Sequence, residues 1–269
     1  MKRGQVTVFV ILGIFLVVIL FFTTYFISDL RSFFSHSSKE NYISYDYLQD
    51  QAAGQMNACV SSSLAEAVFA VSASAGYVSA SPDAKYGESG AADFVVSRGE
   101  EFPVVLDSGG VKFLDDDDVS QRICRKAYVD ANECFNSSRY EESGFEVSTD
   151  DASDLAFVDG NCRVVIKNET VILRMNYSLS LKKDDFAFNL TSFSSDGKYR
   201  IKQLRGEAIR LAYIAERNNS MNESCGLPSW VSLEKLPGGA FKLVDSESQF
   251  LPELYFGFAF RGFDLESVC

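Results

Sequence analysis

The sequence is poor in histidine and in the short motifs that mark most enzymes. Its one histidine, His36, lies close to a long apolar segment, which argues against Ser-His and Cys-His catalysis and against metal sites built on imidazole. Neither a Cys-x-x-Cys pair nor a glycine-rich phosphate-binding loop is present. Two Ser-x-x-Lys matches, at Ser195 and Ser232, are what chance gives in a Ser-rich chain. We therefore expect no catalytic residue, no metal and no cofactor, and so a protein that is not an enzyme.

Charged side chains are absent from residues 6–27. At about 1.5 Å per residue, a helix of this length reaches roughly 33 Å and spans a hydrocarbon core of about 30 Å. Lys2 and Arg3 precede the run and Asp29 follows it, so the positive-inside rule predicts a cytoplasmic N-terminus and an extracellular C-terminal domain. A cleaved secretory signal is the alternative, although the run is long for one and no small-x-small site follows it. We expect a single-pass protein of the cell membrane, in contact with membrane lipid.

Glycine and proline are both absent between Gly13 and Gly54, so no residue forces the helix to end at the membrane surface. Apolar or small residues then recur at three- and four-residue steps, which is typical of an amphipathic helix; they are Leu48, Ala52, Met56, Cys59, Val60, Leu64, Ala67, Val68 and Val71. Ser and His residues at 35–38 leave two alternatives open, one continuous helix or two. We predict an extended helix over 28–75 that packs on an antiparallel sheet.

The apolar run opens with Lys2-Arg3-Gly4-Gln5-Val6-Thr7-Val8-Phe9. This stretch resembles the leader, of the class III type, of archaeal type IV pilin-like proteins. In that family a membrane peptidase cuts between a basic-Gly pair and the Gln that opens the helix, so the resemblance implies cleavage between Gly4 and Gln5. Phe9 stands where such pilins usually carry a Glu that registers one subunit against its neighbour. One N-terminal helix followed by a Cys-bearing outer domain is also similar to archaeal membrane-anchored surface proteins.

The part of the chain beyond Ile27 is strongly acidic. It holds all 37 acidic residues and 23 of the 25 basic ones, a formal charge of −14. Nucleic acid and anionic lipid are poor partners for such a surface. With 46% apolar residues in the whole chain, this part is long enough to bury a real core.

Cysteines and glycosylation motifs both indicate an oxidising, extracellular compartment. All six cysteines lie beyond the apolar run: Cys59, Cys124, Cys134, Cys162, Cys225 and Cys269. Six cysteines allow about 15 pairings, among which Cys124 with Cys134 is the predicted local pair. Asn-x-Ser/Thr motifs begin at Asn136, Asn168, Asn176, Asn189, Asn218 and Asn222. We expect disulfides and N-linked glycans on the outer domain.

The first part of the outer domain reads as a mixture of strands, a helix and acidic loops. Short β-prone runs at 94–97, 102–106 and 111–114 include a hairpin around Gly109 and Gly110. Four carboxylates at 115–118 lack the alternating ligands and the Gly turn of a calcium loop, so we predict that Asp118 caps a helix over 119–130. Residues 136–154 are acidic and Ser-rich, which is typical of a surface loop or of a boundary between subdomains.

An antiparallel meander is the clearest β signal in the second part. Within 170–181, Val171, Leu173, Met175, Tyr177, Leu179 and Leu181 alternate with mostly polar residues, which is the pattern of a half-buried strand. Strands over 162–167 and 186–193 are predicted beside it. A helix over 200–217 has one apolar face that we expect to cover the meander. Two further β segments, 241–244 and 254–263, carry aromatic residues that we assign to the core.

These patterns predict an α+β protein with five segments. They are a cytoplasmic leader-like tail at 1–5, a transmembrane helix at 6–27, the extended helix at 28–75, an α+β subdomain at 76–154 and a meander-plus-helix subdomain at 155–269. Two functions fit. The first is a pilin-like structural subunit of a filament or pseudopilus, whose partners are copies of itself or other pilin-like subunits. The second is an anchored surface protein that binds or adheres without assembling.

Overall fold

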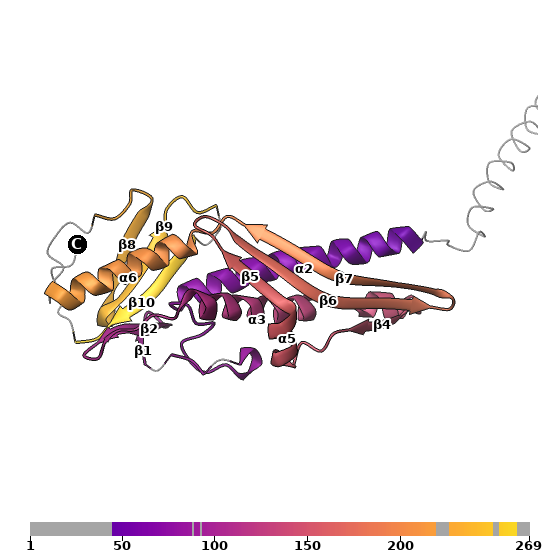
Figure 1. The fold of residues 1–269 in the computed structure, drawn as a ribbon, viewed down its shortest axis with the longest axis horizontal. Coiled ribbons are helices and arrows are strands. Elements are labelled where there is room, and N and C mark those ends of the chain that lie inside the picture. Colours follow the sequence, from indigo (N-terminus) through magenta and orange to yellow (C-terminus); the bar gives the residue numbers. More distant parts are fainter. Residues whose placement is uncertain (1–44, 88, 92, 219–225, 250–252, 263–269) are drawn as a thin grey trace, which may run out of the picture. The chain divides into compact units, whose positions relative to one another are not determined.

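The structure is a computed structural model that describes residues 45–87, 89–91, 93–218, 226–249 and 253–262 (Figure 1). The predicted leader site at Gly4 and Gln5 and the predicted membrane helix at 6–27 lie outside these residues. So does the 35–38 segment, where one helix or two remain open. The chain divides into two compact units, Met1–Gln51 and Ala52–Cys269. The elements below belong to the second unit, except for the first residues of its N-terminal helix.

Helix α2 (Tyr45–Ala73) follows the predicted amphipathic pattern. Every position of the predicted apolar stripe, from Leu48 to Val71, is buried. The positions between them expose polar side chains, among them Asn57, Ser61 and Glu66. By length and composition alone, Asp46–Ala73 could cross a membrane, and 50% of its most apolar window is buried. A buried apolar face opposite an exposed polar face is typical of a helix in a folded domain.

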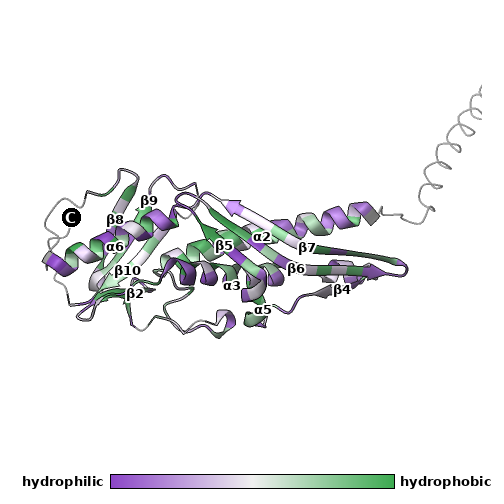
Figure 2. Cartoon of the chain, viewed as in Figure 1, coloured by the Kyte–Doolittle hydropathy of each residue, from purple (hydrophilic) through white to green (hydrophobic). Residues whose placement is uncertain are grey.

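A four-stranded antiparallel sheet forms around β6 (Val171–Lys183). β7 (Phe186–Gly197) pairs along β6, while β5 (Cys162–Ile166) and β4 (Glu146–Thr149) pair with its first and last parts. The six inward residues predicted within 171–181 are each at most 1% exposed, and the alternation appears as coloured bands on the strands in Figure 2. The predicted meander is therefore confirmed.

Residues 136–154, predicted as a surface loop or a boundary between subdomains, contain regular structure. They contain α4 (Ser138–Glu142), which buries Tyr140, and the strand β4. Glu146 pairs with Lys182 and Thr149 with Leu179. β6 extends well beyond the end of β5, and its last part can therefore hold a second strand. The sequence did not mark this strand, because Val147 is the one apolar residue among its four and no apolar alternation results.

Helix α3 (Asp116–Cys134) is longer than predicted and has a different cap. The carboxylate of Asp115, rather than that of Asp118, accepts the N-capping hydrogen bond, which the backbone N–H of Asp118 donates over 2.7 Å. Any of the four aspartates at 115–118 could serve as the N-cap by residue type. Asp115 is the N-cap because its carboxylate reaches the backbone N–H of the third helical residue, Asp118. A short helix, α5 (Leu155–Asn161), follows β4 and was not predicted. Both α3 and α5 contact β5.

The second sheet joins strands that are far apart in the chain. Its order is β1-β2-β10-β9-β8, with β3 beside β2. The bounds are β1 Phe94–Ser97, β2 Glu100–Asp107, β3 Gly110–Val111, β8 Val231–Leu236, β9 Ala240–Asp245 and β10 Tyr255–Phe260. β2 and β10 run parallel, and the other pairs are antiparallel. The predicted hairpin at Gly109 and Gly110 and the aromatic core strand are confirmed, whereas β8 was missed.

Helix α6 (Ile201–Asn218) buries its predicted apolar face but covers a different sheet from the one expected. Its contacts are with β10, β9, β3 and β2. The prediction that it covers the meander was wrong, because the helices that contact the meander strand β5 are α3 and α5. Because α6 directly follows the meander in the chain, the sequence suggested the meander as its partner. The helix instead packs on the sheet that contains β2, β3, β9 and β10.

The predicted boundary between 76–154 and 155–269 does not separate the two sheets. β4 belongs with β5, β6 and β7, while β1, β2 and β3 belong with β8, β9 and β10. Both sheets thus take strands from either side of residue 155, and both lie in the compact unit Ala52–Cys269.

Candidate functional surfaces

Two disulfides link helix α3 to other elements of the described chain. Cys59 of α2 bonds to Cys134 at the end of α3, with Cα atoms 5.6 Å apart. Cys124 of α3 bonds to Cys162 at the start of β5, with Cα atoms 5.8 Å apart. Disulfides of this kind fit an oxidising compartment, and the apolar α2 is a helix that could anchor in a membrane by length and composition. Cys225 and Cys269 lie outside the described residues.

The predicted pairing of Cys124 with Cys134 is wrong. Both residues lie in α3, where the helical rise separates Cα atoms ten positions apart by about 15 Å. A disulfide needs Cα atoms within about 7 Å. The prediction ended the helix at Asp130, which would have left Cys134 free to turn back toward Cys124.

Four of the six predicted glycosylation sites are described completely, and all four are exposed. Asn136 follows α3, Asn168 lies in the β5–β6 turn, and Asn176 and Asn189 lie on β6 and β7. This exposure agrees with the requirement that an acceptor asparagine be accessible at the surface. Asn218 is the last residue of α6, and Asn222 lies outside the described residues. Glycosylation itself stays a prediction.

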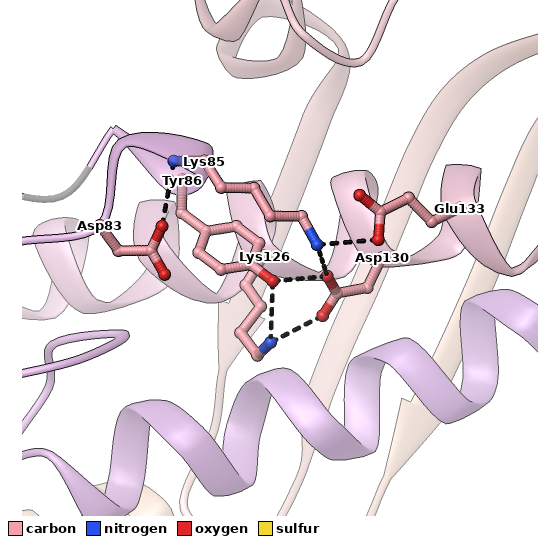
Figure 3. A network of polar contacts seen from close by, with 6 residues as sticks. All are labelled: Asp83, Lys85, Tyr86, Lys126, Asp130 and Glu133. Carbon is pink, nitrogen blue, oxygen red and sulfur yellow. Dashed lines mark hydrogen bonds and ion pairs between the residues drawn. The ribbon is translucent and has the colours of Figure 1, made fainter.

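A network of charged and phenolic groups ties the short helix η1 (Ala84–Tyr86) to α3 (Figure 3). The Nζ of Lys126 donates to Asp130 over 2.7 Å, and the Oη of Tyr86 donates to the same carboxylate over 2.8 Å. Burial opposes the charge on Lys126, but hydrogen bonds and attraction from Asp130 outweigh it and raise the pKa of the amine. A protonated amine cannot serve as a general base. The network therefore acts as a structural tie.

A groove of about 560 Å³ follows one edge of β5. Its walls are the first two turns of α3, Asp159 of α5 and the five residues of β5. Four carboxylates line it, those of Asp116, Asp117, Asp118 and Asp159, against one guanidinium, that of Arg163. Its lining therefore attracts cations and repels anions.

Two of these four carboxylates are already paired. Arg125 donates to Asp159 through two hydrogen bonds of 2.8 and 2.6 Å, which lower the pKa of that carboxyl. Asp116 forms ion pairs with Arg205 and Lys202. Within the described chain, Asp117 and Asp118 have no ion-pair partner. These two are the carboxylates available to a ligand.

Metal binding has no support in the geometry of the described residues. Among them, no group of three or more His, Cys, Asp or Glu side chains is arranged to hold an ion. The acidic run at 115–118 provides a helix cap and two ion pairs instead. The sequence did not predict the groove beside this run, because the groove depends on the strand pairing that leaves one edge of β5 without a partner among the described strands.

Comparisons of the chain with protein-family models, with curated proteins and with solved structures gave no match.

Proposed function

We propose that this chain is a single-pass, membrane-anchored cell-surface protein whose helix α2 connects the anchor to the outer domain and packs on its sheets. The anchor is the uncharged run at 6–27, and the basic residues Lys2 and Arg3 keep the N-terminus in the cytoplasm. The outer domain then lies in an oxidising space, which suits the two disulfides.

The observation that carries this proposal is the buried stripe of α2. From Ala52 to Val71, eight stripe residues are at most 4% exposed, and burying each large apolar side chain is worth about 1.5 to 3 kcal/mol. The Oγ of Ser72 donates to the carbonyl of Tyr255 over 2.6 Å, and the ring of Phe69 meets that of Tyr255 edge to face. A free stalk would leave such a stripe in water.

We further propose a pilin-like structural role, in which the helix of the anchor packs against other subunits of a filament or pseudopilus. The leader-like sequence from Lys2 to Phe9 and the absence of Gly and Pro between Gly13 and Gly54 support this role. A helix that leads from an anchor into a cross-linked outer domain suits such a subunit, because pulling forces then reach the fold through a disulfide at Cys59.

The second candidate is an anchored surface protein that binds a partner and never polymerises. Phe9 at the position of the registering Glu supports it. The acidic groove beside β5, with two unpaired carboxylates, also supports it, since a purely structural subunit has no need of an open charged groove.

The N-terminal residue of the protein isolated from its own membrane tests the leader. We expect Gln5 at the N-terminus, and we expect replacement of Gly4 by a bulky residue to slow the cut. Arg3→Lys, which keeps the basic charge, is the control. Intact Met1 to Gly4 on all native molecules would refute the leader but not the anchor.

Shearing of intact cells tests assembly. If the chain is a filament subunit, the sheared fraction contains it in particles that sediment as polymers. If the chain stays entirely with the membrane and is extracted by detergent as single molecules, the surface-binding candidate replaces the pilin-like one.

A further inference from the structure

We propose that the groove along β5 is a docking site for an extended, Lys- or Arg-rich segment of a partner protein, which adds to the sheet as a new strand. The site is independent of filament assembly. It rests on the uncovered edge of β5, on the groove beside that edge and on the charge of the lining.

The edge is available because, among the described strands, β5 pairs with one only. Among the described strands its partner is β6, from Cys162 opposite Met175 to Ile166 opposite Val171. The groove lies along β5 and is lined by all five of its residues. A strand edge that opens into a groove offers its peptide groups to an added strand.

The turn between β5 and β6 determines which peptide groups of β5 face the groove. The backbone N–H of Lys167 donates to the carbonyl of Thr170 over 2.8 Å, so these two residues form a hydrogen-bonded pair. In an antiparallel ladder, bonded and non-bonded pairs alternate. Arg163 and Val165 therefore bond toward β6, while Val164 and Ile166 direct their N–H and C=O groups away from it and toward the groove.

The charge of the lining selects the partner. Every second side chain of an added strand points to the side of the sheet that α3 contacts, where Asp117 and Asp118 have no ion-pair partner in the described chain. A basic side chain at those positions gains charge-assisted hydrogen bonds. An acidic segment is repelled, and the whole chain carries a net charge of −12, so a second copy is a poor occupant.

The test uses the full chain in detergent micelles and a fluorescent peptide of about eight residues, a typical strand length, that alternates Lys with Val. We expect binding at low ionic strength, measured by fluorescence anisotropy against empty micelles. The same peptide with Glu in place of Lys should not bind. A third peptide, methylated on alternate backbone nitrogens so that it cannot pair with an edge, should bind at least about tenfold more weakly, since it loses several hydrogen bonds.

Two variants of the chain locate the site. Ile166→Pro removes one N–H that points into the groove and leaves the bonds to β6, so we expect binding of the Lys-Val peptide to weaken about tenfold. Asp117→Asn with Asp118→Asn should weaken it severalfold and flatten its dependence on salt. The matched control is Asp184→Asn with Asp185→Asn in the exposed β6–β7 turn, which should change nothing.

Several outcomes would overturn the proposal. Equal binding of the methylated peptide to the unaltered chain would mean charge attraction without strand addition. Because this comparison uses the unaltered chain, it tests strand addition even if Ile166→Pro fails to fold. Equal weakening by the control pair would place the attraction on the acidic surface in general. A dimer of the chain that Ile166→Pro abolishes in sedimentation would make a second copy the occupant.

Discussion

The two sheets of the unit Ala52–Cys269 are held together in different ways. In the sheet around β6, hairpins join β5, β6 and β7, and both disulfides of the described chain lie in the helices and strand around it. The other sheet joins β1, β2 and β3 to β8, β9 and β10, and no described disulfide reaches it. It depends on aromatic packing, as between Phe241 and Phe258, whose rings stack 5.5 Å apart. Side-chain packing thus supports both sheets, and among the described residues disulfides are added around one of them only.

Helix α2 has contacts in both regions. Cys59 links it to α3, which contacts β5, and Ser72 and Phe69 link its other end to Tyr255 of β10. If α2 helps to hold both regions together, a substitution in its buried stripe should destabilise both. Removing one disulfide, or changing a residue of one sheet, should act more locally.

The largest effect is expected from Leu64→Asp in α2. Leu64 is 1% exposed, so the change removes a buried side chain and forces a carboxylate into an apolar site. We expect a loss of about 4 kcal/mol or more in the free energy of unfolding, measured by thermal melting of the full chain in detergent. Ser62→Asp places the same charge on the exposed side of the same helix and should change little. An equal loss in both variants would mean that the stripe is not part of the core.

Removing a disulfide should come next. For Cys59→Ala with Cys134→Ala, whose cysteines are 75 residues apart, the chain-entropy model gives a loss of about 4.5 kcal/mol. For Cys124→Ala with Cys162→Ala, 38 residues apart, it gives about 0.6 kcal/mol less. Denaturant unfolding of both double variants shows which of them loses more free energy of unfolding. A larger loss from the shorter loop would show that the links act by fixing native geometry rather than by closing a loop.

A smaller effect is expected where α2 approaches β10. A Cβ on Gly257 would lie 2.2 Å from the carbonyl oxygen of Ala73, so Gly257→Ala should cost about 1 to 3 kcal/mol through forced displacement. Gly206→Ala in α6 is the matched control, because nothing lies within 4 Å of its Cβ. That change should stabilise the helix by about 0.5 to 1 kcal/mol. Melting temperatures that move in the same direction would contradict the close approach.

The smallest effect concerns the stability of the fold at low pH. The hydrogen bonds and charge of Arg125 lower the pKa of Asp159 in the folded state, so this pair stabilises the fold above the ordinary carboxyl pKa of about 3.9. The contribution is lost as the pH falls through the lowered value. We expect Asp159→Asn to reduce stability slightly at neutral pH and to reduce the further loss below about pH 4. Parallel curves of melting temperature against pH for both proteins would rule out the contribution.

The sequence was sufficient where structure is local. Alternation from Val171 to Leu181 predicted β6 and its neighbours, and the spacing from Ala52 to Val71 predicted the buried face of α2. The turn at Gly109 and Gly110 predicted its hairpin in the same way, because each pattern reports the surroundings of adjacent residues.

Prediction failed where partners are distant. The parallel pairing of β2 with β10 joins residues such as Val104 and Ala259, and no local pattern encodes it. The sheet that α6 covers and the partners of Cys124 and Cys134 depend on the same long-range arrangement. The groove along β5 follows from strand register, which the sequence alone does not give.

The central claim is that α2 belongs to the core of the folded domain that holds the two sheets, rather than serving as a stalk. Amide hydrogen exchange of the full chain in detergent tests it most directly, because exchange in a core helix requires opening of the core. The account predicts that amides from Ala52 to Ala73 exchange as slowly as those of β6 and β10, and that Leu64→Asp speeds exchange in both sheets. Fast exchange along this part of α2 while both sheets stay protected would contradict it.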